Sequence, residues 1–187
     1  YRAAGLDDTH CGPIDDDFEA ARGWQVDPGN SDSATGGAWQ RAIPQKNSTS
    51  AGQKQRAYGY SARYALVTGA ARGASATADL DGMTSVRSPQ FGLGAPSSSG
   101  WRVQFRYTFA HGANATSADY LRLLVDGAEV WRASGSASER NAAWQLVTVP
   151  LDAYAGQNVR LTFEACDCAG DSLVEAAVDD VRVYQVP

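Results

Sequence analysis

Apolar and polar residues alternate without a break from Trp101 to Phe109, in the middle of the chain. Trp101, Val103, Phe105, Tyr107 and Phe109 fall on one face of this segment, and arginine, glutamine and threonine fall on the other. Successive side chains of a β-strand point to opposite faces, so the pattern predicts a strand with one buried face and one wet face. The same period returns at residues 121–125, 145–149 and 159–165.

Turn-forming residues separate these segments, and Asp126-Gly127 is a strong hairpin signal. The first hundred residues are looser, with plausible strands at 16–19, 24–26, 65–68 and 85–91. Residues 42–63 are polar and poor in aliphatic side chains, which predicts a long surface excursion. Helical spacing is hard to find outside a candidate turn at 151–155. Many short strands at regular intervals predict an all-β fold, a two-sheet antiparallel β-sandwich.

Length and charge narrow the functional classes. The chain has 187 residues, 43% of them hydrophobic, enough for one core, so we expect a leader at 1–15 and a single domain at 16–187. The net charge is −5 and the only lysines are Lys46 and Lys54, which argues against nucleic acid as a partner. No apolar run approaches the roughly 20 residues that cross a membrane. Because the chain has no start Met and no signal-peptide pattern, we expect it to be part of a longer one. We also expect it to be a monomer.

The cysteines are odd in number, namely Cys11, Cys166 and Cys168. The spacing Cys166-Asp167-Cys168 is too tight for an ordinary disulfide between its own members. Two interpretations stay open: Cys11 pairs with one of the other two and leaves a thiol over, or all three are reduced. Binding of a soft metal is disfavoured, because the spacing is not that of a zinc ribbon.

Two adjacent acids, Asp179 and Asp180, interrupt the last predicted strand. Counted back from Val181 and Val183, the alternation places Asp179 on the core face and Asp180 on the solvent face beside Arg182. An ionised carboxylate facing a core needs compensation, and Ca²⁺ with its six to eight oxygen ligands is a suitable partner. The alternatives are that Asp179 caps a strand end, that it pairs with an arginine, or that a bulge turns it outward.

A second acidic segment, Asp79-Leu80-Asp81-Gly82, offers alternating carboxylates and a glycine that permits a sharp bend. It begins like an EF-hand loop, but no helices are predicted beside it and no glutamate occupies the twelfth position. Asp79 and Asp81 are therefore further candidate calcium ligands.

Several motifs together resemble a known family. The chain resembles the jelly-roll accessory domain at the C-terminus of secreted bacterial zinc carboxypeptidases, and more distantly the MAM and calcium-binding carbohydrate-binding jelly rolls. The motifs are "DFEAARGW", "LVTGAARG", "DLDGMTSVRSP", "FRYTFAHGANATSADYLRLLVDG", "LVTVPLDAYAGQNVRLTFEA" and "SLVEAAVDDVRV". They cover roughly residues 16–183. The central string is the specific one, and the "CDC" segment and the Cys11 leader depart from the family pattern.

The resemblance implies an exported, non-catalytic jelly roll that often holds a structural calcium ion. In that family the acid of the "FE" opening and an acid of the final "DD" meet near one end of the sandwich, which here are Glu19 and Asp179. The expected partner is then the catalytic domain of a secreted, extracellular hydrolase, in particular a peptidase, and the expected roles are stability, secretion or attachment to a polysaccharide or protein substrate.

The chain carries few residues suited to catalysis but several aromatic side chains that could bind a ligand. Two histidines and the absence of HExxH and G-x-S-x-G motifs argue against catalysis by this chain. The alternative function is a carbohydrate-binding module that stacks sugar rings on exposed aromatic side chains. The candidates for stacking are Trp39, Tyr58 and Tyr60, and the two tyrosines stand out because their surroundings are so polar.

Overall fold

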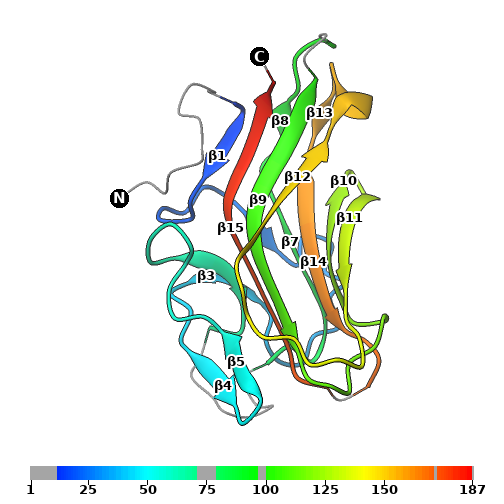
Figure 1. Ribbon diagram of the computed structural model, residues 1–187. Helices are drawn as coiled ribbons and strands as arrows, with labels where there is room; N and C mark the ends of the chain where they lie inside the picture. The colour runs from blue at the N-terminus through cyan, green and yellow to red at the C-terminus, as the bar shows by residue number, and fades with distance from the viewer. Residues whose placement is uncertain (1–11, 71–78, 97–99, 171, 187) are drawn as a thin grey trace.

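Two antiparallel sheets face each other in the computed structural model, which describes residues 12–70, 79–96, 100–170 and 172–186 (Figure 1). Sheet A has the order β12-β9-β15-β6-β3, and β1 pairs with β15 off this path. Its strands are β1 (Ile14–Asp16), β3 (Trp39–Ala42), β6 (Ala65–Thr68), β9 (Trp101–His111), β12 (Gln145–Pro150) and β15 (Val174–Gln185).

Sheet B has the order β11-β10-β14-β7-β2. Its strands are β2 (Gln25–Val26), β7 (Gly82–Arg87), β10 (Tyr120–Val125), β11 (Ala128–Ser134) and β14 (Leu161–Asp167). Two small ladders complete the described fold, β8 (Phe91–Gly92) with β13 (Asn158–Val159) and β4 (Asn47–Thr49) with β5 (Gly52–Gln55). A single 3₁₀ turn, η1 (Asp152–Tyr154), lies within the predicted turn at 151–155. The predicted two-sheet antiparallel β-sandwich is confirmed.

The core lies between the sheets and follows the predicted alternation. The apolar residues of β9 are all buried, and Phe105 packs edge-on against Phe163 of sheet B with ring centroids 5.0 Å apart. Trp131 of β11 lies 5.2 Å from Phe105 on the same side. Aromatic pairs with this geometry add to the stability that burial provides.

The Asp126-Gly127 hairpin joins β10 and β11 as predicted. Val125 pairs with Ala128, and the two residues between them have φ angles of 46° and 86°. Positive φ at both central positions is the requirement of a type I′ turn, which matches the twist of the flanking strands.

A β-bulge between Asp179 and Arg182 divides β15 into two halves with different neighbours. Before the bulge, Ala177 and Val178 pair with β6; after it, β1 pairs with residues 181–183. The extra residue also resets which side chains face the core, which are Val174, Ala176 and Val178 before the bulge and Val181 and Val183 after it. Asp179 is therefore on the outer face of sheet A, so the prediction of a core-facing Asp179 is wrong and the alternative of an outward bulge is the one observed.

The predicted surface excursion at residues 42–63 is also wrong in part. Residues 47–55 form the hairpin β4–β5, which packs against β15 and β9 at one end of sheet A (Figure 1). Its residues Asn47, Lys54 and Gln55 are buried. The polar composition of this segment predicts exposure, but these buried side chains are stabilised by hydrogen bonds and an ion pair.

The chain also differs from expectation near both ends. Ile14 and Asp15, placed in the leader by the sequence, pair in β1 with Val183 and Arg182. Cys166 and Cys168 are joined to each other, with Cα atoms 5.4 Å apart, inside the usual range for a disulfide. The two cysteines can pair because β14 ends at Asp167, between them, where the chain leaves the extended conformation. Cys11, the other predicted disulfide candidate, lies outside the described residues.

Among the described residues, none belongs to a helix long and apolar enough to cross a membrane.

Candidate functional site

Two carboxylates from distant parts of the chain hold residues 57–64, here called the clasp loop, against sheet A. Asp179 Oδ2 accepts hydrogen bonds from the backbone N–H groups of Tyr60 (2.6 Å) and Ser61 (3.2 Å). Glu19 Oε1 accepts from the backbone N–H groups of Arg63 (2.8 Å) and Tyr64 (2.6 Å). The loop therefore covers the outer side of sheet A next to the bulge. Glu19 and Asp179, which the resemblance places together, each bond to the backbone of this loop, at different residues.

Gly59 is required at the start of the clasp loop. A Cβ atom there would collide with the carbonyl oxygen of Tyr64 and would lie 2.8 Å from Asp179 Oδ2. The carboxylate can approach the loop backbone this closely only because the residue has no side chain.

Asp180 is the residue inserted by the bulge, and it is buried. Its φ is 49° and it is 8% exposed, so the prediction that it faces water beside Arg182 is wrong. Its carboxylate accepts a hydrogen bond from the Ser61 side chain, and its backbone N–H donates to Asp179 Oδ1 at 2.7 Å. Both acids thus contact the clasp loop.

Both adjacent carboxylates have raised pKa values. Burial, together with the neighbouring charge of Asp180, raises the pKa of Asp179 to about 7, although the backbone N–H groups of Asp180, Tyr60 and Ser61 oppose the rise. Burial also raises the pKa of Asp180, with Ser61 and Arg182 opposing the rise. Hydrogen bonds to the charged form compensate only part of the cost of desolvation.

Arg41 supplies positive charge on the Glu19 side of the clasp loop. Its guanidinium donates to the backbone carbonyls of Phe18 and Glu19, both at 2.7 Å, and lies 4.2 Å from the centroid of the Tyr64 ring. A planar guanidinium suits both contacts at once, since it forks to two oxygens and stacks on a ring.

The Tyr60 side chain rests on sheet A beside two residues that the sequence did not single out. The Arg106 guanidinium lies 4.3 Å from the Tyr60 ring centroid, and the Trp144 ring approaches edge-on at 6.0 Å. Leu146, which pairs with Arg106 on the neighbouring strand, is 43% exposed. These residues, with Tyr58 two positions before Tyr60 on the clasp loop, are here called the aromatic surface, which consists of Tyr58, Tyr60, Arg106, Trp144 and Leu146.

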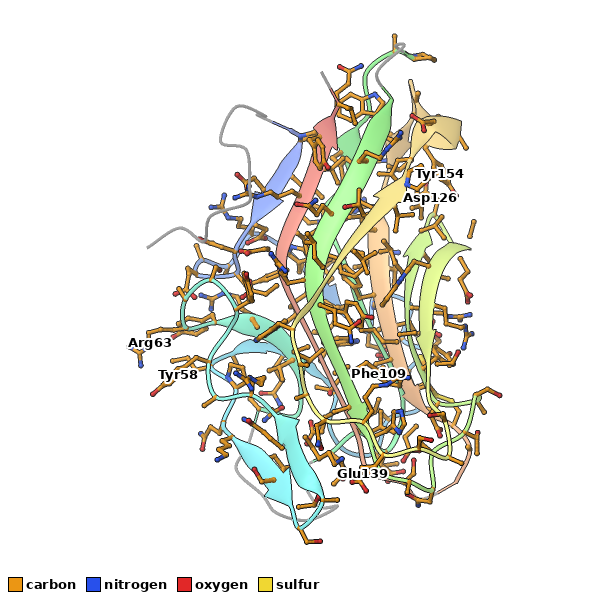
Figure 2. All side chains as sticks on the ribbon, viewed as in Figure 1. Tyr58, Arg63, Phe109, Asp126, Glu139 and Tyr154 are labelled. Carbon is orange, nitrogen blue, oxygen red and sulfur yellow. A yellow bond between two sulfur atoms is a disulfide. The ribbon has the colours of Figure 1, made fainter. Side chains whose placement is uncertain are left out.

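Tyr58 is the most exposed member of this surface. It is 54% exposed, has a φ of 71°, and extends from the clasp loop with Arg63, away from the sandwich (Figure 2). A positive φ is rare for a bulky residue and is maintained here by the hydrogen bond from Tyr58 N to the Pro44 carbonyl (3.1 Å). Tyr58 also lines a shallow groove with Ile43, Pro44 and Lys46.

Trp39 does not belong to the aromatic surface. It is 2% exposed, it lies in the core cluster, and its indole Nε1 donates to the Thr84 carbonyl at 3.2 Å. The prediction that Trp39 stacks on a ligand is wrong, because its strand turns this side chain toward the other sheet.

The structure does not bring the four predicted calcium ligands together. Asp81 bonds the Thr35 hydroxyl, and Asp79 is buried close to Glu175, while Glu19 and Asp179 already accept backbone N–H groups of the clasp loop. Within the described ranges, no group of three or more His, Cys, Asp or Glu side chains could hold a metal ion. These four residues thus do not fit one calcium site.

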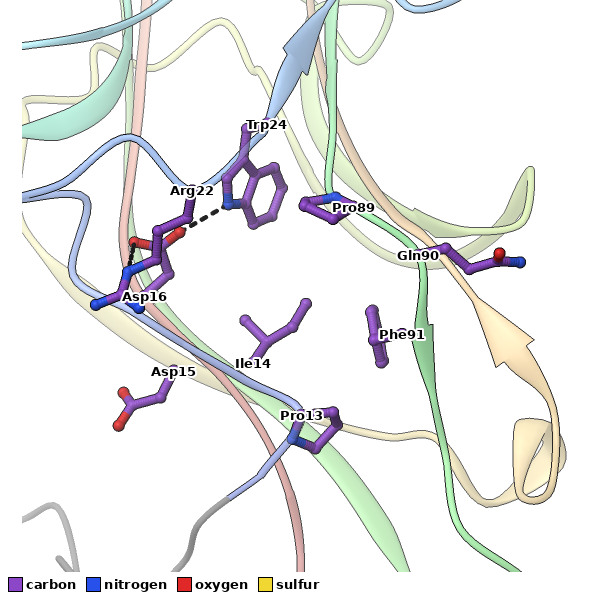
Figure 3. Close-up of a pocket in the computed structure, with 9 residues that line it drawn as sticks. All are labelled: Pro13, Ile14, Asp15, Asp16, Arg22, Trp24, Pro89, Gln90 and Phe91. Atoms are coloured by element: carbon purple, nitrogen blue, oxygen red, sulfur yellow. Dashed lines mark hydrogen bonds and ion pairs between the residues drawn. The ribbon is translucent and has the colours of Figure 1, made fainter.

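A separate pocket of about 140 Å³ opens between β1 and the segment that contains β8 (Figure 3). Its walls include Ile14, Trp24 and Phe91, and its polar groups include Asp16 and Arg22. Asp16 accepts from the Trp24 indole (2.9 Å) and lies 3.4 Å from the Arg22 guanidinium. Burial raises the pKa of Asp16, and these donors oppose the rise.

Trp144 is the site residue that sequence reasoning missed, although a signal for it exists. In the segment after Ala143, Gln145, Val147 and Val149 share the core-facing side of β12, so Trp144 and Leu146 are both turned outward. Trp144, immediately before β12, and Leu146, on β12, thus occupy successive outward positions at the edge of sheet A. Two apolar side chains there are unusual, since sheet edges are commonly protected by charge. Arg106 could not have been chosen in the same way, because an outward arginine on a strand is ordinary.

Comparisons with solved structures identify proteins that share this fold. No protein-family model and no curated protein matches the chain. Among solved structures, the K3 cleaved adhesin domain of Lys-gingipain from Porphyromonas gingivalis W83 is similar, with a TM-score of 0.61 and 14% identity over 93% of this chain and 99% of that chain. The K2 cleaved adhesin domain of Lys-gingipain has a TM-score of 0.52 and 14% identity, over 93% and 98%. Identity this low shows a shared fold and nothing about ligands.

Proposed function

We propose that this chain is a non-catalytic binding domain of an exported bacterial protein, and that it binds polysaccharide at the aromatic surface. The observation that carries the proposal is the grouping of Tyr60, Trp144 and Arg106 on the outer face of sheet A, with Tyr58 exposed on the same loop as Tyr60. Aromatic rings offer a flat apolar partner for pyranose rings, and a guanidinium offers donors for hydroxyl groups.

The opposite face of the sandwich is less suited to a ligand. On sheet B the Tyr120 ring is covered by the Arg132 and Arg122 guanidinium groups at 4.0 Å and 4.9 Å. These arginines are paired in turn with Glu129 and Glu164. A ligand there would have to displace ion pairs, whereas on sheet A it would meet exposed apolar area.

Attachment to a secreted hydrolase and a structural calcium ion belong to the same proposal. The fold shared with adhesin domains supports a role in attachment, and the family resemblance supports export and a peptidase parent. The neighbouring sequence of the parent gene tests the association with a hydrolase: a parent chain with no hydrolase domain would contradict it.

Retention on insoluble glycans tests the binding proposal. We expect the wild-type domain to be retained on at least one member of a panel of polysaccharides, and Tyr58→Ala and Trp144→Ala to weaken retention about tenfold or more, as truncation of an aromatic anchor does. Val26→Ala is the matched control, because Val26 is 42% exposed on sheet B.

Gln90→Ala, at the rim of the pocket in Figure 3, is a second control. Loss of retention in this variant with normal retention in Trp144→Ala would move the ligand to the pocket. Failure of the wild type to bind any glycan would contradict the proposal.

A further inference from the structure

Positive charge is concentrated in one segment of this acidic chain. Residues 33–78 contain six lysine and arginine residues, among them both lysines of the protein, and no aspartate or glutamate. The rest of the chain holds the other ten arginines and all 21 acids. The cationic segment contributes Tyr58 and Tyr60 to the aromatic surface, although the chain as a whole carries a net charge of −5.

Three of these cations are exposed around Tyr58. Lys46 lines the shallow groove with Tyr58, and Arg56 immediately precedes a residue of the groove wall. The backbone N–H of Gly59 donates to the Arg63 carbonyl (3.0 Å), which brings Arg63 back to the start of the clasp loop. The side chains of Tyr58 and Arg63 extend on the same side of the molecule (Figure 2).

No carboxylate among the described residues forms an ion pair with these three side chains. Their one side-chain hydrogen bond to a described residue is long, 3.4 Å from Arg56 to Gln53. The other described cations of the segment are engaged, because Lys54 is buried and pairs with Glu139, and Arg41 donates to two backbone carbonyls. Within this part of the chain, the three exposed cations can therefore meet an anionic ligand.

The carboxylates that contact the clasp loop do not cancel this charge at the surface. Asp179 and Asp180 are buried, and both accept hydrogen bonds from the loop. Glu19 accepts two backbone N–H groups of the loop. Hydrogen bonds to a carboxylate compensate its negative charge, so a ligand that approaches the loop from solvent meets the exposed cations first.

We propose that the surface around Tyr58 binds an acidic polysaccharide, with a sugar ring stacked on Tyr58 and its anionic groups held by Lys46 and Arg63. This assignment rests on the function proposed above and adds the class of substrate. Carboxylate and sulfate groups share the required chemistry, since both accept charge-assisted hydrogen bonds from ammonium and guanidinium groups. Duplex DNA is less suited, because it carries one charge per about 1.7 Å and would be repelled by the acids in the rest of the chain.

Retention on immobilised polygalacturonate and dextran sulfate, compared with neutral dextran and galactan, tests the proposal. EDTA is present throughout, so that metal ions cannot bridge the protein to the gel. We expect stronger retention on at least one acidic gel than on either neutral gel, and a several-fold fall in retention as NaCl rises from about 50 to 500 mM, because salt screens exposed charges. Preference for one acidic gel over the other identifies the anionic group as carboxylate or sulfate.

Two substitutions test the residues that hold the anion. Lys46→Gln and Arg63→Gln should each weaken retention on the acidic gel about twofold to fivefold, as the loss of one exposed ion pair does. Both side chains are exposed, so the melting temperatures should stay those of the wild type. Arg160→Gln is the matched control, because it removes one positive charge beside Asp126, which lies far from Tyr58 (Figure 2), and its retention should equal that of the wild type.

The outcomes separate this assignment from the proposed function. Retention on neutral gels that neither salt nor the two substitutions weaken would overturn the acidic ligand and leave polysaccharide binding intact. Failure to bind any glycan would contradict both. Retention on immobilised duplex DNA as strong as on the acidic gels would overturn the assignment, because charge alone would then account for binding. An equal loss in Arg160→Gln and Lys46→Gln would overturn it as well.

Discussion

The buried Asp179 carboxylate predicts that the fold loses stability as the pH rises from about 4 to 8. Burial and the adjacent charge of Asp180 raise the pKa of Asp179 from 3.8 to about 7. Between these two values the folded state binds more protons than the unfolded state, so the free energy of unfolding falls as the pH rises. The perturbation that isolates this residue is Asp179→Asn, which keeps the shape of the side chain and removes the titration.

The size of the effect follows from the shift. One pKa unit corresponds to 1.36 kcal/mol, so a group shifted by about 3 units costs the fold about 1.5 kcal/mol at pH 5 and about 4 kcal/mol at pH 8. The difference, about 2–3 kcal/mol, is the stability that the wild type should lose over this range relative to Asp179→Asn. Both oxygens of Asp179 accept backbone N–H groups, whereas an amide has one acceptor oxygen. The contact on the other side is lost at every pH and does not affect this difference.

Urea unfolding followed by tryptophan fluorescence at pH 5, 6, 7 and 8, with a chelator present, measures the difference. Glu175 and Asp167, which also have raised pKa values, titrate in both proteins and cancel, whereas Asp180 interacts with Asp179 and its titration is part of the difference. Asp15→Asn, at a carboxylate whose side chain is 60% exposed, should follow the wild type at every pH. Parallel curves for the wild type and Asp179→Asn would refute the reasoning that the clasp carboxylate is desolvated.

Two further predictions concern contacts that the sequence did not reveal. Arg41→Ala should lower the free energy of unfolding by about 2–3 kcal/mol, because it removes the guanidinium that donates to the Phe18 and Glu19 carbonyls. Arg41→Lys should lower it less. Equal stability of the wild type and both variants in urea unfolding would contradict this prediction. Cys168→Ser should destabilise the fold by about 1–2 kcal/mol, since the disulfide closes a very short loop, and peptide mapping without reduction should recover Cys166 linked to Cys168; a linkage to Cys11 would disprove the pairing.

The sandwich itself could be predicted from the sequence because its signals are local. The alternation in β9 and the Asp126-Gly127 turn each depend on neighbouring residues, and the structure has both where they were expected. The strand at Ala65–Thr68 was likewise found within its predicted bounds. Patterns of period two indicate a half-buried strand wherever they occur.

The candidate site could be predicted only in part. Tyr58 and Tyr60 were chosen for their polar surroundings, and Tyr58 is exposed as expected. Trp39 was chosen only as an aromatic side chain and lies in the core, because a tryptophan on a short strand gives no indication of which face it occupies. Trp144 joins Tyr60 through a contact between residues 84 positions apart, which no local pattern reveals.

The sequence by itself determined the fold class, the core face of β9 and the presence of acids in the final strand. Only the tertiary structure decided what those acids do. One inserted residue, Asp180, reverses the face of every side chain before it relative to those after it, and so turns Asp179 away from the core and toward the clasp loop. A bulge of this kind depends on the neighbours of β15, which change from β6 to β1 at that point, and strand neighbours are a property of the folded chain.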